Sequence, residues 1–309
     1  MTYRKKTESK KGRANHIRIS PQEKILHAVN IALLTSIMFV CVYPFWYVII
    51  GSFSSADAIS AGVFLWPVNF TVHTYQEIFK KGDIGHAFLI SVCRVVSGTV
   101  LCLFCCTFFA YLMTRREMLG RKFVYRFIIA TMYVNAGLIP WYLTMKMYGL
   151  RNNFLVYILP GAMNAYFIIL IKTFIEQLPP SLEESAALDG AGFFQVYRSI
   201  ILPLSKPVIA TCAVYISVGQ WNAWQDNYFL VTDTRLQTVQ LILYNYLHEA
   251  EQLASSMRSG MVTENAANMI SPAGVRMAIT VITVFPILCV YPSLQKYFAK
   301  GIMMGAVKG

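Results

Sequence analysis

Long stretches without a charged residue restrict the folds open to this chain more than any other feature. Because an α-helix rises about 1.5 Å per residue, about 20 apolar residues cross the hydrocarbon core of a membrane. Six charge-free intervals of about this length are predominantly apolar: 25–56, 95–114, 127–145, 152–171, 207–225 and 277–295. Charged residues make up only 14% of the chain, against about 25% in soluble domains. We therefore predict an all-α integral membrane protein with six transmembrane helices.

The six intervals define one predicted domain, residues 25–300. With their flanking residues, the transmembrane spans are expected at about 25–51, 88–113, 126–146, 153–174, 207–230 and 275–297. A basic leader, 1–24, precedes the domain, and a short tail, 301–309, follows it. The first apolar stretch is longer than the core of a signal peptide, about 7 to 15 residues, so we predict an uncleaved anchor. A further charge-free interval, 58–76, is broken by glycine, proline and polar residues and is interpreted as an ordered outer loop.

The distribution of Lys and Arg favours one orientation in the membrane. Cytoplasmic loops carry an excess of these residues. Eight of the 27 precede the first span, and a cytoplasmic amino terminus places 19 of them on the inner side and 6 on the outer side. Both termini are therefore predicted to be cytoplasmic. The net charge of +12 follows from this topology and does not indicate a nucleic acid partner.

The sequence indicates neither a nucleotide site nor a metal site. It has no Gly-Lys dipeptide, so it lacks the P-loop that cradles the phosphates of ATP. All seven cysteines lie in apolar stretches, which argues against a disulfide framework. Cys102, Cys105 and Cys106 are close in sequence, but no His or carboxylate adjoins them, and we predict no metal. A membrane-embedded enzyme and a stand-alone channel are the alternative classes of membrane protein. The five histidines are scattered along the sequence, which disfavours the enzyme.

The connection 176–205, between the fourth and fifth predicted spans, is longer than two neighbouring helices need. Two consecutive prolines at 179 and 180 end the preceding helix. Ser181 and Glu184 have the spacing of a capping box, in which a hydroxyl and a carboxylate satisfy amide groups at a helix start. A new helix is therefore predicted to begin at this point.

That helix is expected to end after about two turns. Gly190 and Gly192 permit the positive φ values that close a helix, and a second short helix, 193–201, is predicted to stop at Leu202–Pro203. The result is a helix–turn–helix elbow on the cytoplasmic face. From the residues alone it is either a structural loop or a docking site, because its small residues would let another protein approach closely.

Polar residues gather densely where the fifth predicted span ends. Trp221, Asn222, Trp224, Gln225 and Asp226 lie close together there, and such residues are costly in lipid unless they face a cavity or a partner. They are candidates for a translocation path or its outer gate. Alternatively, three residues of this region mark the outer membrane interface, where aromatic residues are enriched: Trp224, Asp226 and Tyr228.

Two other polar residues adjoin or interrupt apolar stretches. Asn135, in the third predicted span, is a further candidate for the path, although an amide also bridges neighbouring helices. Arg94 is expected to extend toward the interface or to pair within the protein.

The elbow carries a pattern that resembles a family signature. Glu184-Ser185-Ala186, then Gly190, and after nine further residues Ile200-Ile201-Leu202-Pro203 resemble the EAA signature of binding-protein-dependent ABC importer permeases, with Ser185 in place of the usual first alanine. In that family the signature forms a coupling helix that docks in a cleft of the ATP-hydrolysing subunit. The resemblance implies an ATPase-coupling role for nine residues: Glu183, Glu184, Ser185, Ala186, Ala187, Asp189, Gly190, Leu202 and Pro203.

Other segments resemble the carbohydrate branch of these importers, namely the smaller permease of maltose-type systems and permeases for complex oligosaccharides. These segments are 65–70, 114–122, 135–140, 159–161 and 300–305, so the resemblance runs from Ile25 to the end. It implies a type I ABC importer permease fold with a cytoplasmic coupling helix and the import of sugars, in particular oligosaccharides. Aromatic faces beside amides and a carboxylate, as at 221–226, would suit such a substrate.

The resemblance also implies partners. A second homologous permease, two ATP-binding subunits and an extracellular sugar-binding protein, lipid-anchored or soluble, would complete an importer among the lipids of a bacterial cell membrane. ATP and Mg would be held by the ATP-binding subunits, and this chain would bind no cofactor and would not be an enzyme. In maltose-type importers the larger permease makes most sugar contacts, so the path residues of this chain are expected to gate more than they bind.

Overall fold

The computed structural model describes residues 21–80, 84–258 and 271–306, and every regular element in these ranges is helical. The all-α prediction is thereby confirmed. In chain order the elements are α1 (Pro21–Ser52), α2 (Ala56–Ala61), α3 (His73–Lys80), α4 (Ile84–Thr114), α5 (Arg121–Tyr133), α6 (Leu138–Met147), η1 (Phe154–Tyr157), α7 (Ala165–Ile175), α8 (Ser181–Leu188), α9 (Phe193–Val196), η2 (Tyr197–Ile201), α10 (Leu202–Leu204), α11 (Lys206–Asn222), α12 (Gln225–Leu230), η3 (Thr234–Leu236), α13 (Val239–Arg258) and α14 (Pro272–Ala306).

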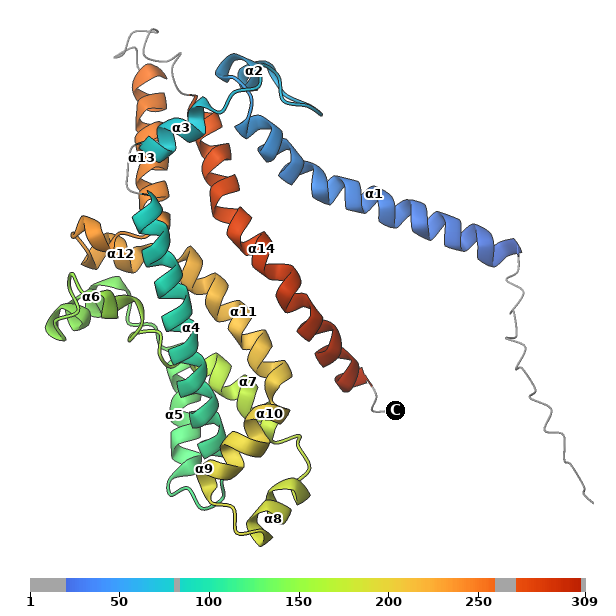
Figure 1. Ribbon diagram of the computed structural model, residues 1–309, viewed down its shortest axis with the longest axis vertical. Helices are drawn as coiled ribbons and strands as arrows, with labels where there is room; N and C mark the ends of the chain where they lie inside the picture. Colours follow the sequence, from blue (N-terminus) through green and yellow to red (C-terminus); the bar gives the residue numbers. More distant parts are fainter. Residues whose placement is uncertain (1–20, 81–83, 259–270, 307–309) are drawn as a thin grey trace, which may run out of the picture. The chain divides into compact units, whose positions relative to one another are not determined.

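The described part of the chain divides into two units, with the boundary between Tyr47 and Val48 (Figure 1). Most of α1 makes up the described part of the first unit. Its side chains from Gln22 to Trp46 are all exposed, and no residue of the helix from Ile25 to its end is charged. A helix that is apolar on every side is stable in lipid or against other protein rather than in water.

Helix α4 is the central element of the second unit. It packs against α7 and α11. The buried side chains of Cys106, Tyr111, Ile171, Ile201 and Cys212 contribute to the main hydrophobic core between these helices and the elbow. One helix therefore contacts both the elbow and the membrane-spanning part of the unit.

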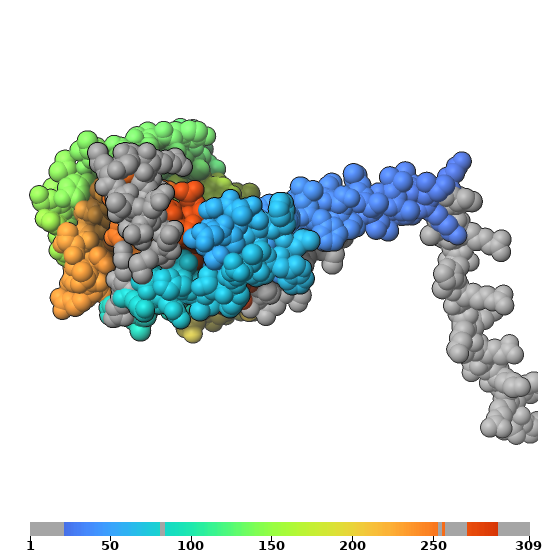
Figure 2. Space-filling model, turned by 90° about the horizontal axis from the view of Figure 1, so that it is seen from above, coloured from blue at the N-terminus to red at the C-terminus, as the bar shows by residue number. Residues whose placement is uncertain are grey.

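A second hydrophobic core lies toward the other end of α4. Ile84 of α4 packs there with Ile78 of α3, Leu243 of α13 and Val275 of α14. Figure 1 shows this group at one end of α4 and the elbow helices α8, α9 and α10 at the other. Figure 2 views the unit from above, with α3 in cyan at the surface. Helix α4 thus links the two ends of the unit without a break.

Three of the six predicted spans are not single helices. The interval 126–146 contains most of α5, a non-helical link at 134–137 and most of α6. Gly137 in this link has φ 79°, a value that a right-handed helix cannot continue. The interval 153–174 contains η1, a second link at 158–164 with a Pro-Gly pair, and most of α7. The prediction of an unbroken helix is therefore wrong for both intervals.

The fifth predicted span, 207–230, divides into α11 and α12 at Ala223–Trp224. By length and composition, three described helices are suited to crossing a membrane: α1, α4 and the 272–289 part of α14. The described residues contain a fourth candidate span if the helical segment 193–204 and α11 are counted as one broken span. These two segments meet at an angle of 77°. The count of six spans stays a prediction.

Candidate functional site

The elbow expected from the sequence is present, but its first helix starts differently. Helix α8 has the expected length of about two turns. Ser181 is its first residue rather than its cap, because Pro180 already has helical dihedral angles, φ −59° and ψ −28°. The carbonyl of Pro180 accepts hydrogen bonds from the amides of Glu183 at 3.0 Å and Glu184 at 3.1 Å, and no side chain caps the helix. The predicted capping box is therefore wrong.

The turn after α8 confirms one of the two predicted glycine roles. Gly190 has φ 78°. The amides of Gly190 and Ala191 donate to the carbonyls of Ala187 at 3.1 Å and Ala186 at 2.9 Å, which are the two hydrogen bonds of a Schellman motif. Gly192 has φ −73° and ψ 164°, which any residue adopts, so its predicted positive φ is wrong.

The second arm of the elbow is longer than predicted. Helix α9 continues through the π-helical turn η2 into α10, so Leu202–Pro203 does not stop it. The amide of Leu202 donates to the carbonyl of Tyr197, five residues back. This wider turn leaves space for the ring of Pro203, which has no N–H to donate. The chain changes direction only at Ser205, before α11.

The outer side of α8 is exposed, whereas its inner side packs on the protein. Glu184, Ser185, Ala187 and Asp189 are exposed, and Ala186 is buried in the main core. Of the other predicted coupling residues, Gly190 and Pro203 are exposed, and Glu183 and Leu202 are half-buried. The tip of the elbow also presents Leu188, which is 89% exposed. The outer side of α8 is therefore not covered by the described part of the chain.

An ion pair that the sequence did not reveal fastens the elbow to the end of α4. Nη1 of Arg115 lies 2.7 Å from Oε2 of Glu183 in α8. The guanidinium also lies 4.4 Å from the ring centroid of Tyr111, whose hydroxyl it hydrogen-bonds, and 5.5 Å from the ring of Phe193. The two charged side chains are only 22% and 28% exposed. We call these four residues the latch.

A second contact joins the elbow to the same helix. The hydroxyls of Thr107 in α4 and Tyr197 in η2 lie 2.9 Å apart and are buried. The rings of Tyr197 and Tyr111 stack with centroids 5.3 Å apart. The elbow therefore cannot move away from α4 without breaking the latch and this buried hydrogen bond.

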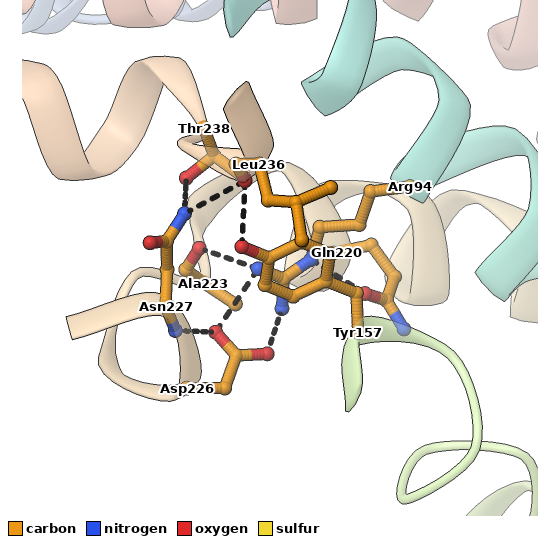
Figure 3. Close-up of polar contacts among 8 residues, drawn as sticks. All are labelled: Arg94, Tyr157, Gln220, Ala223, Asp226, Asn227, Leu236 and Thr238. Carbon is orange, nitrogen blue, oxygen red and sulfur yellow. Dashed lines mark hydrogen bonds and ion pairs between the residues drawn. The ribbon is translucent and has the colours of Figure 1, made fainter. Parts of the chain in front are cut away.

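Farther along α4, Arg94 is surrounded by polar groups from other elements (Figure 3). Its side chain is 4% exposed. Nη1 and Nη2 donate to the two carboxylate oxygens of Asp226 at 3.0 and 2.5 Å. Nε donates to Gln220 Oε1, and Nη1 also donates to the carbonyl of Ala223, both at 3.1 Å. The ring of Tyr157 lies 4.7 Å from the guanidinium. Of the two alternatives expected for Arg94, the structure shows pairing within the protein and not extension toward the interface.

Further hydrogen bonds hold the partners of Arg94 in place. The amide of Asn227 donates to Asp226 Oδ1 at 2.9 Å, and its side chain donates to the hydroxyl of Thr238 at 3.2 Å. The hydroxyl of Tyr157 donates to the carbonyl of Leu236 at 2.7 Å. A buried ion pair is stable only when its remaining polar atoms are satisfied, and this network meets that requirement for the guanidinium.

Arg94, Gln220 and Asp226 line part of an open hollow of about 280 Å³, which we call the polar hollow. Four aromatic rings and an amide complete much of the lining: Trp141, Tyr157, Asn164, Phe167 and Tyr215. The link at 158–164, which interrupts a predicted span, borders this hollow. Non-helical backbone at membrane depth is tolerated where it lines such a cavity or is buried in protein.

The structure does not bring the six predicted path residues together. Asp226 lines the polar hollow. Trp221 is buried, and its Nε1 donates to the carbonyl of Thr283 in α14 at 3.1 Å. Trp224 stacks on Tyr244 of α13 with centroids 3.9 Å apart. The two tryptophans therefore contact neighbouring helices.

The other three predicted path residues are exposed. Oδ1 of Asn222 accepts a hydrogen bond from Gln240 at 3.4 Å. Gln225 is the first residue of α12. Oδ1 of Asn135 accepts a hydrogen bond from the amide of Gly137 at 2.9 Å and so shapes the link between α5 and α6. Their role in a path stays a prediction.

The sequence contains a signal for some of the site residues that the sequence analysis did not identify. Arg94 and Arg115 are the two charges that bound the apolar interval 95–114, so one helix had to hold both near its apolar stretch. Gln220 lies one residue before the selected group, and Tyr157 had no distinguishing signal. Among the described residues, no three His, Cys, Asp or Glu side chains gather as metal ligands would.

A membrane chain with an exposed elbow at one end of α4 and a polar hollow beside broken helices has the features of a transport permease. The family described as binding-protein-dependent transport system inner membrane component matches residues 106–304. The chain belongs to this family.

Similar proteins agree with this assignment over nearly the full chain. Protein LplC of Bacillus subtilis is 36% identical over 287 residues, covering 93% of this chain and 96% of that protein. The polygalacturonan/rhamnogalacturonan transport system permease protein YtcP of the same organism is 35% identical, covering 87% and 93%. A chain in the crystal structure of a bacterial ABC transporter involved in the import of the acidic polysaccharide alginate is 30% identical, with a TM-score of 0.73 and coverage of 90% and 98%.

Family membership makes this chain the multi-pass membrane component of an ABC importer. The predicted type I permease fold is confirmed. The chain is a transport component and not an enzyme. The family implies a partner permease, an ATPase and a solute-binding protein.

Proposed function

We propose that this chain forms one half of a heterodimeric channel for oligosaccharides in a bacterial cell membrane. A second homologous permease forms the other half, and two ATP-binding subunits hold ATP and Mg. An extracellular binding protein, lipid-anchored or soluble, delivers the sugar, and both termini of this chain are cytoplasmic. The names of the similar transport proteins, which concern polygalacturonan, rhamnogalacturonan and alginate, support an oligosaccharide substrate.

The elbow is the proposed site of contact with an ATP-binding subunit. Its outer side is free, while its inner side is held to α4 by the latch. Twenty-one positions separate Arg115 from Arg94, or about 30 Å along a helix. Closure of the ATP-binding subunits would move the elbow, and the latch would pass that movement to α4 and so to the polar hollow. The latch is the observation that carries this proposal.

The polar hollow is the proposed part of the path that this chain contributes. Rings such as Trp141 and Tyr215 offer faces to the apolar sides of a sugar, and Asn164 and Gln220 offer amides to its hydroxyl groups. The charge of Arg94 is balanced by Asp226 through two hydrogen bonds. Among the described residues that line it, the hollow therefore has no unbalanced cation for an acidic sugar. Selection by charge then falls to the binding protein or the partner permease.

The test compares two glycines of the elbow in the assembled importer. Gly190→Asp adds a carboxylate beside Asp189 and strains a residue at φ 78°, whereas Gly192→Asp adds the same group at φ −73°, before a helix where a carboxylate is favourable. A Cβ at either position meets nothing within 4 Å. We expect Gly190→Asp to abolish sugar uptake and Gly192→Asp to retain most of it.

Binding of sugar to the extracellular protein is measured in parallel and is expected to stay unchanged in both variants. Uptake near the wild-type rate in a fully expressed Gly190→Asp importer would refute the coupling role. Uptake of monosaccharides alone, with no oligosaccharide transported, would refute the proposed substrate class.

A further inference from the structure

A basic hollow lies at the turn from α4 into α5, beside the elbow. It has a volume of about 740 Å³, and four cations line it: Arg116, Arg121, Lys122 and Arg126. Phe123 also lines it. The transport mechanism proposed above uses none of these residues, and the latch uses only the preceding Arg115.

The charge of this basic hollow is largely uncompensated. Between residues 114 and 126 the sequence has one acidic residue, Glu117. In the described part of the chain, none of the four cations lies within ion-pair distance of a carboxylate, and Arg121 donates only to the carbonyl of Thr114, at 3.1 Å. The first turn of α5 has neither an acidic residue nor a side-chain cap, so the positive end of its helix dipole adds to the field.

Apolar side chains stand next to these cations on the same helix. Phe123 and Phe127 are 73% and 61% exposed, and their rings stack with centroids 6.4 Å apart. Lys122 and Arg126 have the same four-residue spacing, so α5 carries an aromatic row and a basic row side by side. Leu119, just before the helix, is 96% exposed.

We infer that the basic hollow binds the phosphate headgroup of an anionic phospholipid, with the acyl chains lying along Phe123 and Phe127. A free phosphate would use the cations but not the aromatic row, whereas a phospholipid uses both. Basic side chains at a membrane surface attract anionic headgroups, and guanidinium groups bind phosphate oxygens through paired hydrogen bonds. Such a lipid would hold the turn after α4 at the membrane surface while the adjoining elbow moves.

Native mass spectrometry of the full chain, released from detergent micelles, provides the test. The chain is offered equal amounts of phosphatidylglycerol and phosphatidylcholine, and glycerol phosphate is added as a headgroup without acyl chains. The variant combines Arg116→Gln, Lys122→Gln and Arg126→Gln, all at exposed positions. A matched control removes three exposed cations elsewhere: Lys146→Gln, Arg151→Gln and Arg235→Gln.

We expect selective retention of phosphatidylglycerol by the native chain and the control. Each cation near a surface changes anionic lipid binding by about fivefold, so the apparent affinity of the triple variant should fall by at least about tenfold. Equal loss in the control, equal retention of both lipids, or full displacement by glycerol phosphate would overturn the inference. If the triple variant does not fold, Lys122→Gln and Arg126→Gln are tested singly, and an unchanged lipid preference in both would overturn it.

Discussion

Breaking the ion pair between Arg115 and Glu183 is expected to uncouple ATP hydrolysis from uptake. The pair joins the elbow to α4 with an N–O distance of 2.7 Å. Neutralising either partner would leave α8 attached mainly through Ala186 in the core and through the second arm of the elbow. Movement of the elbow would then reach α4 only in part.

The size of the effect follows from how far the pair is buried. Unit charges 2.7 Å apart attract by about 6 kcal/mol at an effective dielectric constant of about 20, before desolvation is subtracted. Breaking a buried pair costs about 3 to 5 kcal/mol, and an exposed pair contributes less than about 1 kcal/mol. With side chains 22% and 28% exposed, this pair lies between these limits. We expect about 2 kcal/mol, or about a 30-fold shift toward a released elbow.

The assay measures ATP hydrolysis and sugar uptake together in proteoliposomes that contain the complete importer. Arg115→Gln and Glu183→Gln should each lower the number of sugars imported per ATP hydrolysed. The swap Arg115→Glu with Glu183→Arg should restore part of the coupling, because the opposite charges again face each other. Glu117→Gln removes a nearby exposed carboxylate for which the described residues show no ion pair, and it serves as the control.

A double-mutant cycle decides whether the two residues act through each other. The account requires the double neutral variant to be no more impaired than the Arg115→Gln variant alone. If the losses in sugars imported per ATP hydrolysed were strictly additive, the latch would not be transmitting movement. The same would follow if both single variants stayed fully coupled.

Two further predictions concern the polar hollow. Arg94→Gln or Asp226→Asn leaves a buried charge without its partner, which should destabilise the chain by about 3 to 5 kcal/mol; thermal unfolding in detergent should show a clear fall in Tm, and an unchanged Tm would contradict the role of the pair. Gly98→Ala places a Cβ 2.8 Å from Nε2 of Gln220, so this amide should move away from Arg94 and sugar uptake should fall several-fold. Gly219→Ala, whose Cβ meets nothing within 4 Å, should transport normally, and equal losses in both alanine variants would refute displacement of Gln220 as the cause.

Local chemistry predicted that the elbow is present, but it did not predict how α8 begins or which conformation Gly192 adopts. The positive φ of Gly190 and the length of α8 followed from residue types that have few alternatives. Ser181 failed as a cap because the spacing of a capping box does not reveal that Pro180 has already entered the helix. Gly192 failed because glycine permits a positive φ without requiring it.

The polar hollow was harder to predict because its parts are distant in sequence. Asp226 is a predicted path residue, and pairing within the protein is one of two alternatives for Arg94, but 132 positions separate the two residues. Only the packing of α4 against α11 brings them together. The lengths of charge-free intervals located apolar segments but not the breaks within them. Two of those breaks occur at Gly137 and at the Pro160–Gly161 pair. Pro160 and Gly161 line the polar hollow, and Gly137 precedes α6, which contributes Trp141 to the lining.

The most direct test of the proposed coupling is the accessibility of the tip of the elbow in the intact importer. Ala187→Cys places a thiol at an exposed position of α8, and a membrane-impermeant maleimide reports which side it faces, with the unsubstituted chain as the background. We expect labelling from the cytoplasmic side after the ATP-binding subunits are removed and protection when they are bound. Labelling from the extracellular side, or labelling unaffected by the ATP-binding subunits, would contradict the proposed role of the elbow.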